Sequence, residues 1–169
     1  MSSELPDRKH LKRIPIWIPS NQSVIYFVTV CCAGHRQVFC NDFAVKTALE
    51  SLVKCAQATG WNISQVCFMP DHVHLMVSPL QDREQKLSNL IQRWKTSSTQ
   101  RLNRAGLDGY IWQKEFFDRL LRSGESLTDK WRYTEMNPVR AGLCLSFGEY
   151  PYLGAPDAVL KRLQDRFSL

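Results

Sequence analysis

Apolar residues follow two different spacings along the chain, and these spacings separate the expected strands from the expected helices. The stretches 23–32 and 61–69 are rich in β-branched and aromatic residues, which predicts two strands. Apolar residues alternate in MPDHVHLMV, residues 69–77, which predicts a third strand. The Pro70-Asp71 pair predicts a tight turn that joins the last two as a hairpin, and 116–121 predicts a fourth strand.

Three longer segments carry apolar residues at helical spacing. The first helix is expected to begin at Asn41 or Asp42, and the second at Asp82, because all three are good N-cap residues. The third is expected to begin near Ser126 and to end at Pro138, which cannot continue a helix.

The resulting order of elements predicts an α+β fold. Strand, helix, strand, strand, helix, strand is the ferredoxin-like βαββαβ pattern, an antiparallel sheet with both helices on one face, here followed by an added C-terminal helix. We expect a basic N-terminal arm over 1–22, one domain over 23–145, and a C-terminal tail with a short helix over 146–169.

The third strand carries two histidines on one of its faces. Side chains alternate along a strand, so His72 and His74 share a face, whereas Val73, Leu75 and Val77 share the other. We expect the three apolar residues to face the helices. The histidines are then expected on the opposite, uncovered face of the sheet.

Two imidazoles at this spacing can reach one metal ion, although such a pair alone is weak evidence, because surface histidines are common. Tyr133 and Asn137 lie four residues apart, which places them on one face of the third helix. A tyrosine hydroxyl and an amide oxygen beside the histidines would supply a nucleophile and a third metal ligand. Each of these residues also has an ordinary structural explanation.

The chain resembles a known family in four motifs that occur in the family's order: YFVTVCCAGHRQVF, MPDHVHLMV, WQKEFFDRLLR and YTEMNPVRAGL. They resemble those of the single-tyrosine His-hydrophobic-His (HUH) transposases, and specifically the REP-associated tyrosine transposases of bacteria. The resemblance implies an enzyme that binds single-stranded or hairpin DNA with REP-like palindromes. It implies cleavage and strand transfer through a covalent 5′-phosphotyrosine.

The resemblance also implies the roles of four catalytic residues. Tyr133 would be the nucleophile, and His72, His74 and Asn137 would hold a divalent metal, Mg²⁺ or Mn²⁺. Related sequences often carry Asn where Asp71 stands and an aromatic or aliphatic residue where Glu135 stands, and the roles of both residues stay open. Strand geometry predicts that Asp71 points away from the histidines.

Charge indicates a polyanionic partner, since the formal net charge is +6. Candidate DNA contacts are the cations, polar groups and rings that flank the expected elements: His35, Arg36, Arg93, Lys95, Arg101, Trp112, Gln113, Arg119, Arg122, Arg132 and Arg140. Any one of them could instead be an ordinary surface residue. The basic arm could clamp DNA or be a tail.

Other features exclude some classes of protein. The six cysteines contain no CxxC pair, and no apolar segment approaches the roughly 20 residues of a membrane span. No phosphate-binding glycine motif occurs. We therefore expect a cytoplasmic protein without a membrane anchor, either monomeric or homodimeric. Two alternatives stay open: a non-catalytic DNA-binding protein on the same fold, and a phosphodiesterase in which water attacks.

Overall fold

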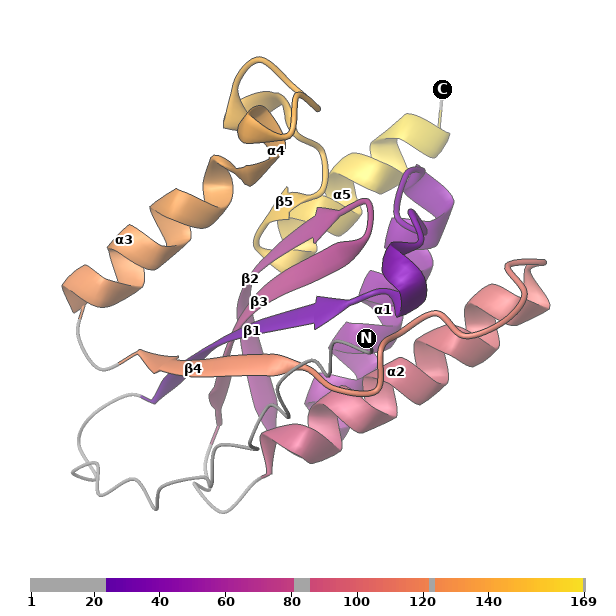
Figure 1. Cartoon of the computed structure of the whole chain (residues 1–169), viewed down its shortest axis with the longest axis horizontal. Coiled ribbons are helices and arrows are strands. Elements are labelled where there is room, and N and C mark those ends of the chain that lie inside the picture. Colours follow the sequence, from indigo (N-terminus) through magenta and orange to yellow (C-terminus); the bar gives the residue numbers. More distant parts are fainter. Residues whose placement is uncertain (1–23, 81–85, 122–123, 169) are drawn as a thin grey trace, which may run out of the picture.

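The computed structural model describes residues 24–80, 86–121 and 124–168 (Figure 1). Its centre is a five-stranded antiparallel sheet in the order β4-β1-β3-β2-β5. The strands are β1 (Ile25–Cys31), β2 (Trp61–Met69), β3 (His72–Pro79), β4 (Phe117–Leu121) and β5 (Leu153–Gly154). The first four follow the predicted ferredoxin-like order, and the predicted α+β fold class is confirmed.

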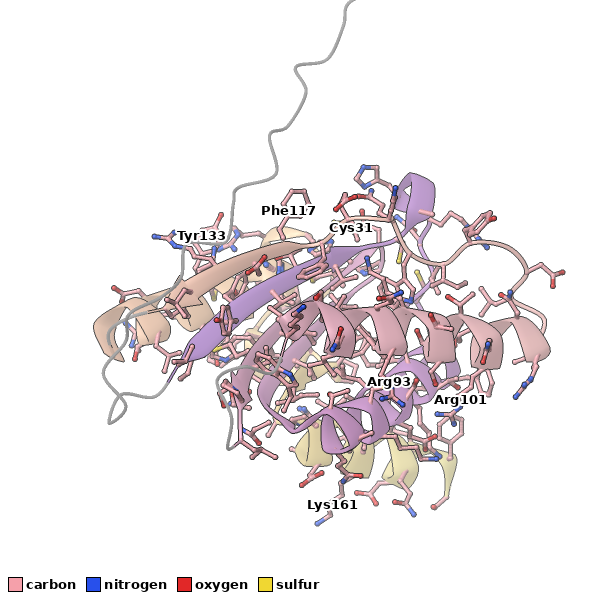
Figure 2. All side chains as sticks on the ribbon, turned by 90° about the horizontal axis from the view of Figure 1, so that it is seen from below. Cys31, Arg93, Arg101, Phe117, Tyr133 and Lys161 are labelled. Carbon is pink, nitrogen blue, oxygen red and sulfur yellow. The ribbon has the colours of Figure 1, made fainter. Side chains whose placement is uncertain are left out.

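Helices lie on both sides of this sheet (Figures 1 and 2). One layer holds α1 (Asp42–Thr59), α2 (Leu87–Arg104) and α5 (Pro156–Phe167). The other side holds α3 (Gly124–Glu135), which leads into the short α4 (Asn137–Arg140). Two short 3₁₀ turns, η1 (Ala33–His35) and η2 (Phe147–Glu149), complete the described elements. Among these residues, no helix has both the length and the apolar composition needed to cross a membrane.

Local sequence explains the limits of α1. The Asn41 side chain caps the helix by accepting a hydrogen bond of 2.9 Å from the backbone N–H of Ala44. Gly60 ends it in a left-handed conformation, with φ 71°, which glycine adopts without a steric penalty. The predicted start of α2 at Asp82 lies outside the described residues, and the described helix begins at Leu87.

The main core lies between the sheet and the layer of α1, α2 and α5. Val73, Leu75 and Val77 belong to it, which confirms that this face of β3 meets the helices. Burial of apolar side chains contributes roughly 25 cal/mol per Å² to stability, so a one-residue change of register, which would expose all three, is strongly disfavoured. Because side chains alternate along the strand, burial of these three residues also fixes both histidines on the other face.

The second face of the sheet is partly covered, so the expectation of an uncovered face was wrong. Phe27, Met76 and Leu121 form a smaller buried cluster there. Leu127 and Trp131 of α3 pack against this cluster. Apolar residues on the histidine face therefore provide a docking surface for α3.

The segment 146–169 contributes more than the expected tail. Leu153 and Gly154 form β5, which pairs with β2, and Val159 and Leu163 of the twelve-residue α5 are fully buried in the main core. A strand of two residues carries no recognisable alternation, so only its pairing with β2 identifies it.

The third predicted helix ends earlier than expected. It stops at Glu135, and α4 begins at Asn137 with Pro138 in its first turn. Backbone N–H groups in the first turn have no partner within the helix, so a proline there costs no hydrogen bond. Pro138 therefore starts a short helix rather than ending the long one.

Candidate functional site

The two histidines of β3 lie side by side on the face that α3 partly covers. Their ring centroids are 4.8 Å apart, and the rings are inclined at 77°. Phe27 of β1 stacks on His74 at 5.2 Å, so the His74 ring is packed on a rigid part of the sheet. The predicted pair is thus held on neighbouring positions of one strand face.

Each histidine is oriented through its Nδ1 atom. Asp71 Oδ1 lies 2.7 Å from Nδ1 of His72, and Thr29 Oγ1 lies 2.9 Å from Nδ1 of His74. In both rings the Nε2 atom is consequently the nitrogen that can face a cation. The expectation that Asp71 points away was wrong, because Asp71 belongs to the turn before β3 and does not follow the strand's alternation.

Asn137, the first residue of α4, lies next to the two histidines of β3. Its Nδ2 atom lies 3.1 Å from Nε2 of His74. The guanidinium of Arg140 donates to Oδ1 of Asn137 and, at 2.7 Å, to the backbone carbonyl oxygen of Tyr133. Arg140 also lies over the Tyr133 ring, 4.0 Å from its centroid. Arg140 therefore ties the predicted nucleophile to the residue that contacts His74.

The Tyr133 side chain is 61% exposed on α3. A second cation, Lys130, lies 5.7 Å from the centroid of its ring and 4.5 Å from that of Phe27. Two cations next to an exposed phenol create a surface that attracts an anion. Figure 2 shows Tyr133 on the side of the sheet away from α1, α2 and α5.

Burial sets the charge state of His74. Desolvation, followed by the neighbouring His72 and Lys130, lowers the pKa of His74 from 6.5 to about 3, so the ring is neutral at pH 7 and keeps a lone pair for a metal. Burial by itself raises the pKa of Asp71. The hydrogen bond and charge of His72 outweigh that effect, so the pKa of Asp71 lies below its usual value and its carboxylate is ionised.

These donors fit a divalent cation. They comprise the Nε2 atoms of two oriented imidazoles and the amide of Asn137, whose oxygen could replace its nitrogen after rotation of the amide group. Nowhere in the described part of the chain do three or more His, Cys, Asp or Glu residues cluster in a way that could hold a metal. A metal held by only His72, His74 and Asn137 would have coordination positions open for other oxygen ligands.

A protein-family model described as "Transposase IS200 like" matches residues 20–127. The chain belongs to the IS200-like transposase family. The match includes both histidines and ends before Tyr133 and Asn137. For these two residues, the support comes from the motif resemblance and from their position in the structure.

This IS200-like transposase is also similar to individual proteins of known sequence. It is 23% identical over 138 residues to a Haemophilus influenzae protein described as a REP-associated tyrosine transposase, covering 76% of this chain and 77% of that protein. An uncharacterized protein from the same organism is 23% identical over 143 residues, covering 68% and 79%.

Two solved structures share the fold. One is a REP-associated tyrosine transposase bound to a REP hairpin, with a TM-score of 0.65 and 20% identity, covering 76% of this chain and 74% of that one. The other is described as a transposase from Deinococcus radiodurans R1, with a TM-score of 0.52 and 18% identity, covering 68% and 90%.

Three further residues contribute to the site of this IS200-like transposase and were not predicted from its sequence. Thr29 orients His74, Phe27 stacks on it, and Lys130 approaches Tyr133. A signal existed for two of them: Thr29 is a polar residue within an apolar run, and Lys130 precedes Tyr133 by three residues on the same helix.

Some predicted DNA contacts lie near the histidines. Arg140 contacts Tyr133, and the exposed Arg119 pairs in register with Phe27, which places it on the histidine face. The His35 side chain is 74% exposed, with Nδ1 3.6 Å from Asp71 Oδ2. Arg132 is exposed on α3, and Arg122 lies outside the described residues, as does the basic arm.

Other predicted contacts have hydrogen-bond partners within the protein. Arg36 donates to the carbonyl oxygens of Asp108 and Tyr110. Lys95 donates to the backbone carbonyl oxygens of Gln113, Lys114 and Glu115, so the contact with Gln113 involves its main chain and not its side chain.

Arg93 and Arg101 lie on α2, in the helix layer opposite the histidines (Figure 2), and Arg101 pairs with Glu50 at 2.9 Å.

The prediction that Trp112 offers a ring to DNA was wrong. Its side chain is only 7% exposed, and its Nε1 atom donates to Ser98 Oγ at 2.9 Å. The ring packs against Trp94 and Phe39 in the main core. Hydrophobic burial decided this position, since a large ring next to other apolar side chains gains more by packing than by exposure.

Proposed function

We propose that this IS200-like transposase is a metal-dependent, single-tyrosine DNA strand transferase that cleaves single-stranded or hairpin DNA through a covalent 5′-phosphotyrosine. The observation that carries the proposal is the contact of 3.1 Å between Asn137 and His74, together with the link from Asn137 to Tyr133 through Arg140. These contacts connect the histidines of β3 to Tyr133 on α3. A merely structural histidine pair does not require this connection.

Tyr133 would act as the nucleophile. Its oxygen attacks the phosphorus atom of a DNA phosphodiester, a new bond forms between them, and the bond from phosphorus to the 3′ oxygen breaks. The phenol proton passes to solvent, and the leaving 3′ oxygen gains a proton. The number of phosphoester bonds is unchanged, so a 3′ hydroxyl can later reverse the reaction without a nucleotide cofactor.

His72, His74 and Asn137 would hold the divalent metal. When bound, Mg²⁺ or Mn²⁺ would act as a Lewis acid that stabilises negative charge on the phosphate oxygens. Asp71 and Thr29 would keep the two imidazoles in the required tautomer and orientation. Lys130 and Arg140 would attract the DNA phosphate to the exposed face of Tyr133.

The proposed substrate is a REP-like palindromic hairpin with an unpaired flank. This choice rests on the motif resemblance and on a fold neighbour that is bound to a REP hairpin. The net charge of +6 supports a polyanionic substrate.

One experiment tests this function. A labelled hairpin oligonucleotide is incubated with Mg²⁺ or Mn²⁺ and either the unaltered protein, Tyr133→Phe or the matched control Tyr110→Phe. Tyr110 is suitable as a control because it is 87% exposed and lies in the loop before β4. We expect a denaturant-resistant protein–DNA adduct with the unaltered protein and with Tyr110→Phe, and none with Tyr133→Phe or with EDTA.

The same assay separates the alternatives. Cleavage that persists in Tyr133→Phe would indicate that water is the nucleophile. Binding without cleavage in either metal would indicate a non-catalytic DNA-binding protein. Each of these outcomes would overturn the strand-transferase proposal.

A further inference from the structure

A half-exposed aromatic ring lies in the same row of the sheet as His74. Phe117 on β4 pairs in register with Thr29 on β1, and Thr29 pairs with His74 on β3. Residues that pair directly across antiparallel strands share a face, so all three side chains are on the histidine face. Figure 2 shows Phe117 and Tyr133 on this same side, away from α1 and α2.

The spacing fits a nucleic-acid strand that crosses the sheet. Phe117 is two strand spacings from His74, which is roughly 10 Å. This separation is comparable with the length of one or two nucleotides. A strand whose phosphate lies beside the histidines can therefore place a neighbouring base over β4.

Charge on this face favours the same ligand. Arg119 follows Phe117 by two residues on β4 and shares its face, and it is exposed. Lys130 and Arg140 lie against the ring of Tyr133, and Lys130 also lies 4.5 Å from the centroid of the Phe27 ring on β1. A ring flanked by cations is the arrangement by which proteins bind unpaired DNA, because bases stack on the ring while phosphates meet the charges.

We propose that Phe117 is the stacking site for an unpaired nucleobase adjacent to the phosphate that Tyr133 attacks. This inference rests on the proposed function. Phe117 is 49% exposed. Single exposed apolar residues are common, so exposure alone would not support a site. The support comes from the register that aligns this ring with His74 and from the cations on the same face. Since every base has a π face, the site would accept any base.

The chain offers a matched control. Phe43 on α1 is also 49% exposed, and α1 belongs to the helix layer on the opposite side of the sheet. Phe43→Leu therefore removes an equally exposed ring from the helix layer on the other side of the sheet. Phe117→Tyr keeps an aromatic ring at the proposed site and should preserve binding.

The test uses a hairpin oligonucleotide whose unpaired flank carries 2-aminopurine at one position at a time. Binding is measured with full-length protein in a Tyr133→Phe background, so that the DNA stays intact. We expect strong fluorescence quenching at one flank position. Phe117→Leu should abolish this quenching and weaken binding by about 5- to 150-fold, the range expected for loss of one base–aromatic stack. Phe43→Leu should match the parent protein, as should Phe117→Tyr.

The proposal is overturned if Phe117→Leu binds and quenches like Phe43→Leu at every position. It is also overturned if Phe117→Leu changes the oligomeric state in sedimentation experiments, which would indicate that the ring contacts a second protein chain. Failure of the proposed function has a different signature. The unaltered protein would then form no Tyr133-dependent adduct, while the quenching on uncleaved DNA would still report whether a base stacks on Phe117.

Discussion

Asn137 and His74 are 63 residues apart in sequence, yet Nδ2 of the first lies 3.1 Å from Nε2 of the second. The contact exists because α3 docks on the histidine face of the sheet and its end delivers α4 to β3. Trp131 and Leu127 provide that docking, and Arg140 connects Asn137 to Tyr133. The geometry of the site therefore depends on helix packing as much as on the residues in it.

Replacing Asn137 by alanine should weaken metal binding. A direct ligand should contribute at least as much as the groups that orient ligands, so we expect Mn²⁺ affinity to fall roughly tenfold or more. Titration calorimetry with Mn²⁺ measures this change. The control is Asn62→Ala, an exposed position on β2. Equal affinities for the two variants would show that Asn137 does not bind the metal.

Asp71 should act on the metal through His72. Without its carboxylate, Nδ1 of His72 loses the partner at 2.7 Å that fixes the ring, so Asp71→Ala should lower Mn²⁺ affinity by about 10- to 100-fold. Asp71→Asn keeps an acceptor oxygen and should lose less. Asp108→Ala, an exposed loop substitution, serves as the control in the same titration. If Asp71→Ala bound Mn²⁺ as tightly as that control, the orienting role would be excluded.

Burial of His74 should make stability depend on pH in the metal-free protein. The pKa of His74 is lowered from 6.5 to about 3, so between these values the unfolded chain binds a proton that the folded chain does not. The free energy of unfolding therefore falls as pH falls through this interval. His74 should account for about 2 kcal/mol of loss between pH 7 and pH 5.

Urea unfolding in EDTA at both pH values measures this effect. His74→Gln should show a smaller loss of stability on acidification than the unaltered protein. An unchanged loss in His74→Gln would show that His74 titrates normally in the folded state.

Trp131 should hold α3 against the sheet. It packs on the cluster of Phe27, Met76 and Leu121, and it is partly buried, so Trp131→Ala should lower the free energy of unfolding by about 1–3 kcal/mol, less than for a fully buried ring. Amide hydrogen exchange should increase in α3 more than in α1. Metal affinity should fall too, because Asn137 is positioned by the same docking. Uniform exchange changes across both helices would argue against a local role.

Sequence patterns alone determined the first four strands of the sheet and the placement of the histidines. The limits of β2 and the Pro70-Asp71 turn agree with the prediction, and alternation on β3 placed Val73 in the core and both histidines on the other face. These features depend on interactions between residues that are close in the chain, or on the burial of one face of a strand. Both leave a periodic signal in the sequence.

The tertiary structure decided the remaining features. The direction of Asp71 depends on a turn, the burial of Trp112 depends on Trp94 and Phe39, and the cover over His74 depends on where α3 docks. The contact between Asn137 and His74 follows from that docking. None of these leaves a local pattern, because each results from packing between segments that are distant in sequence, and packing depends on the shapes of both surfaces at once.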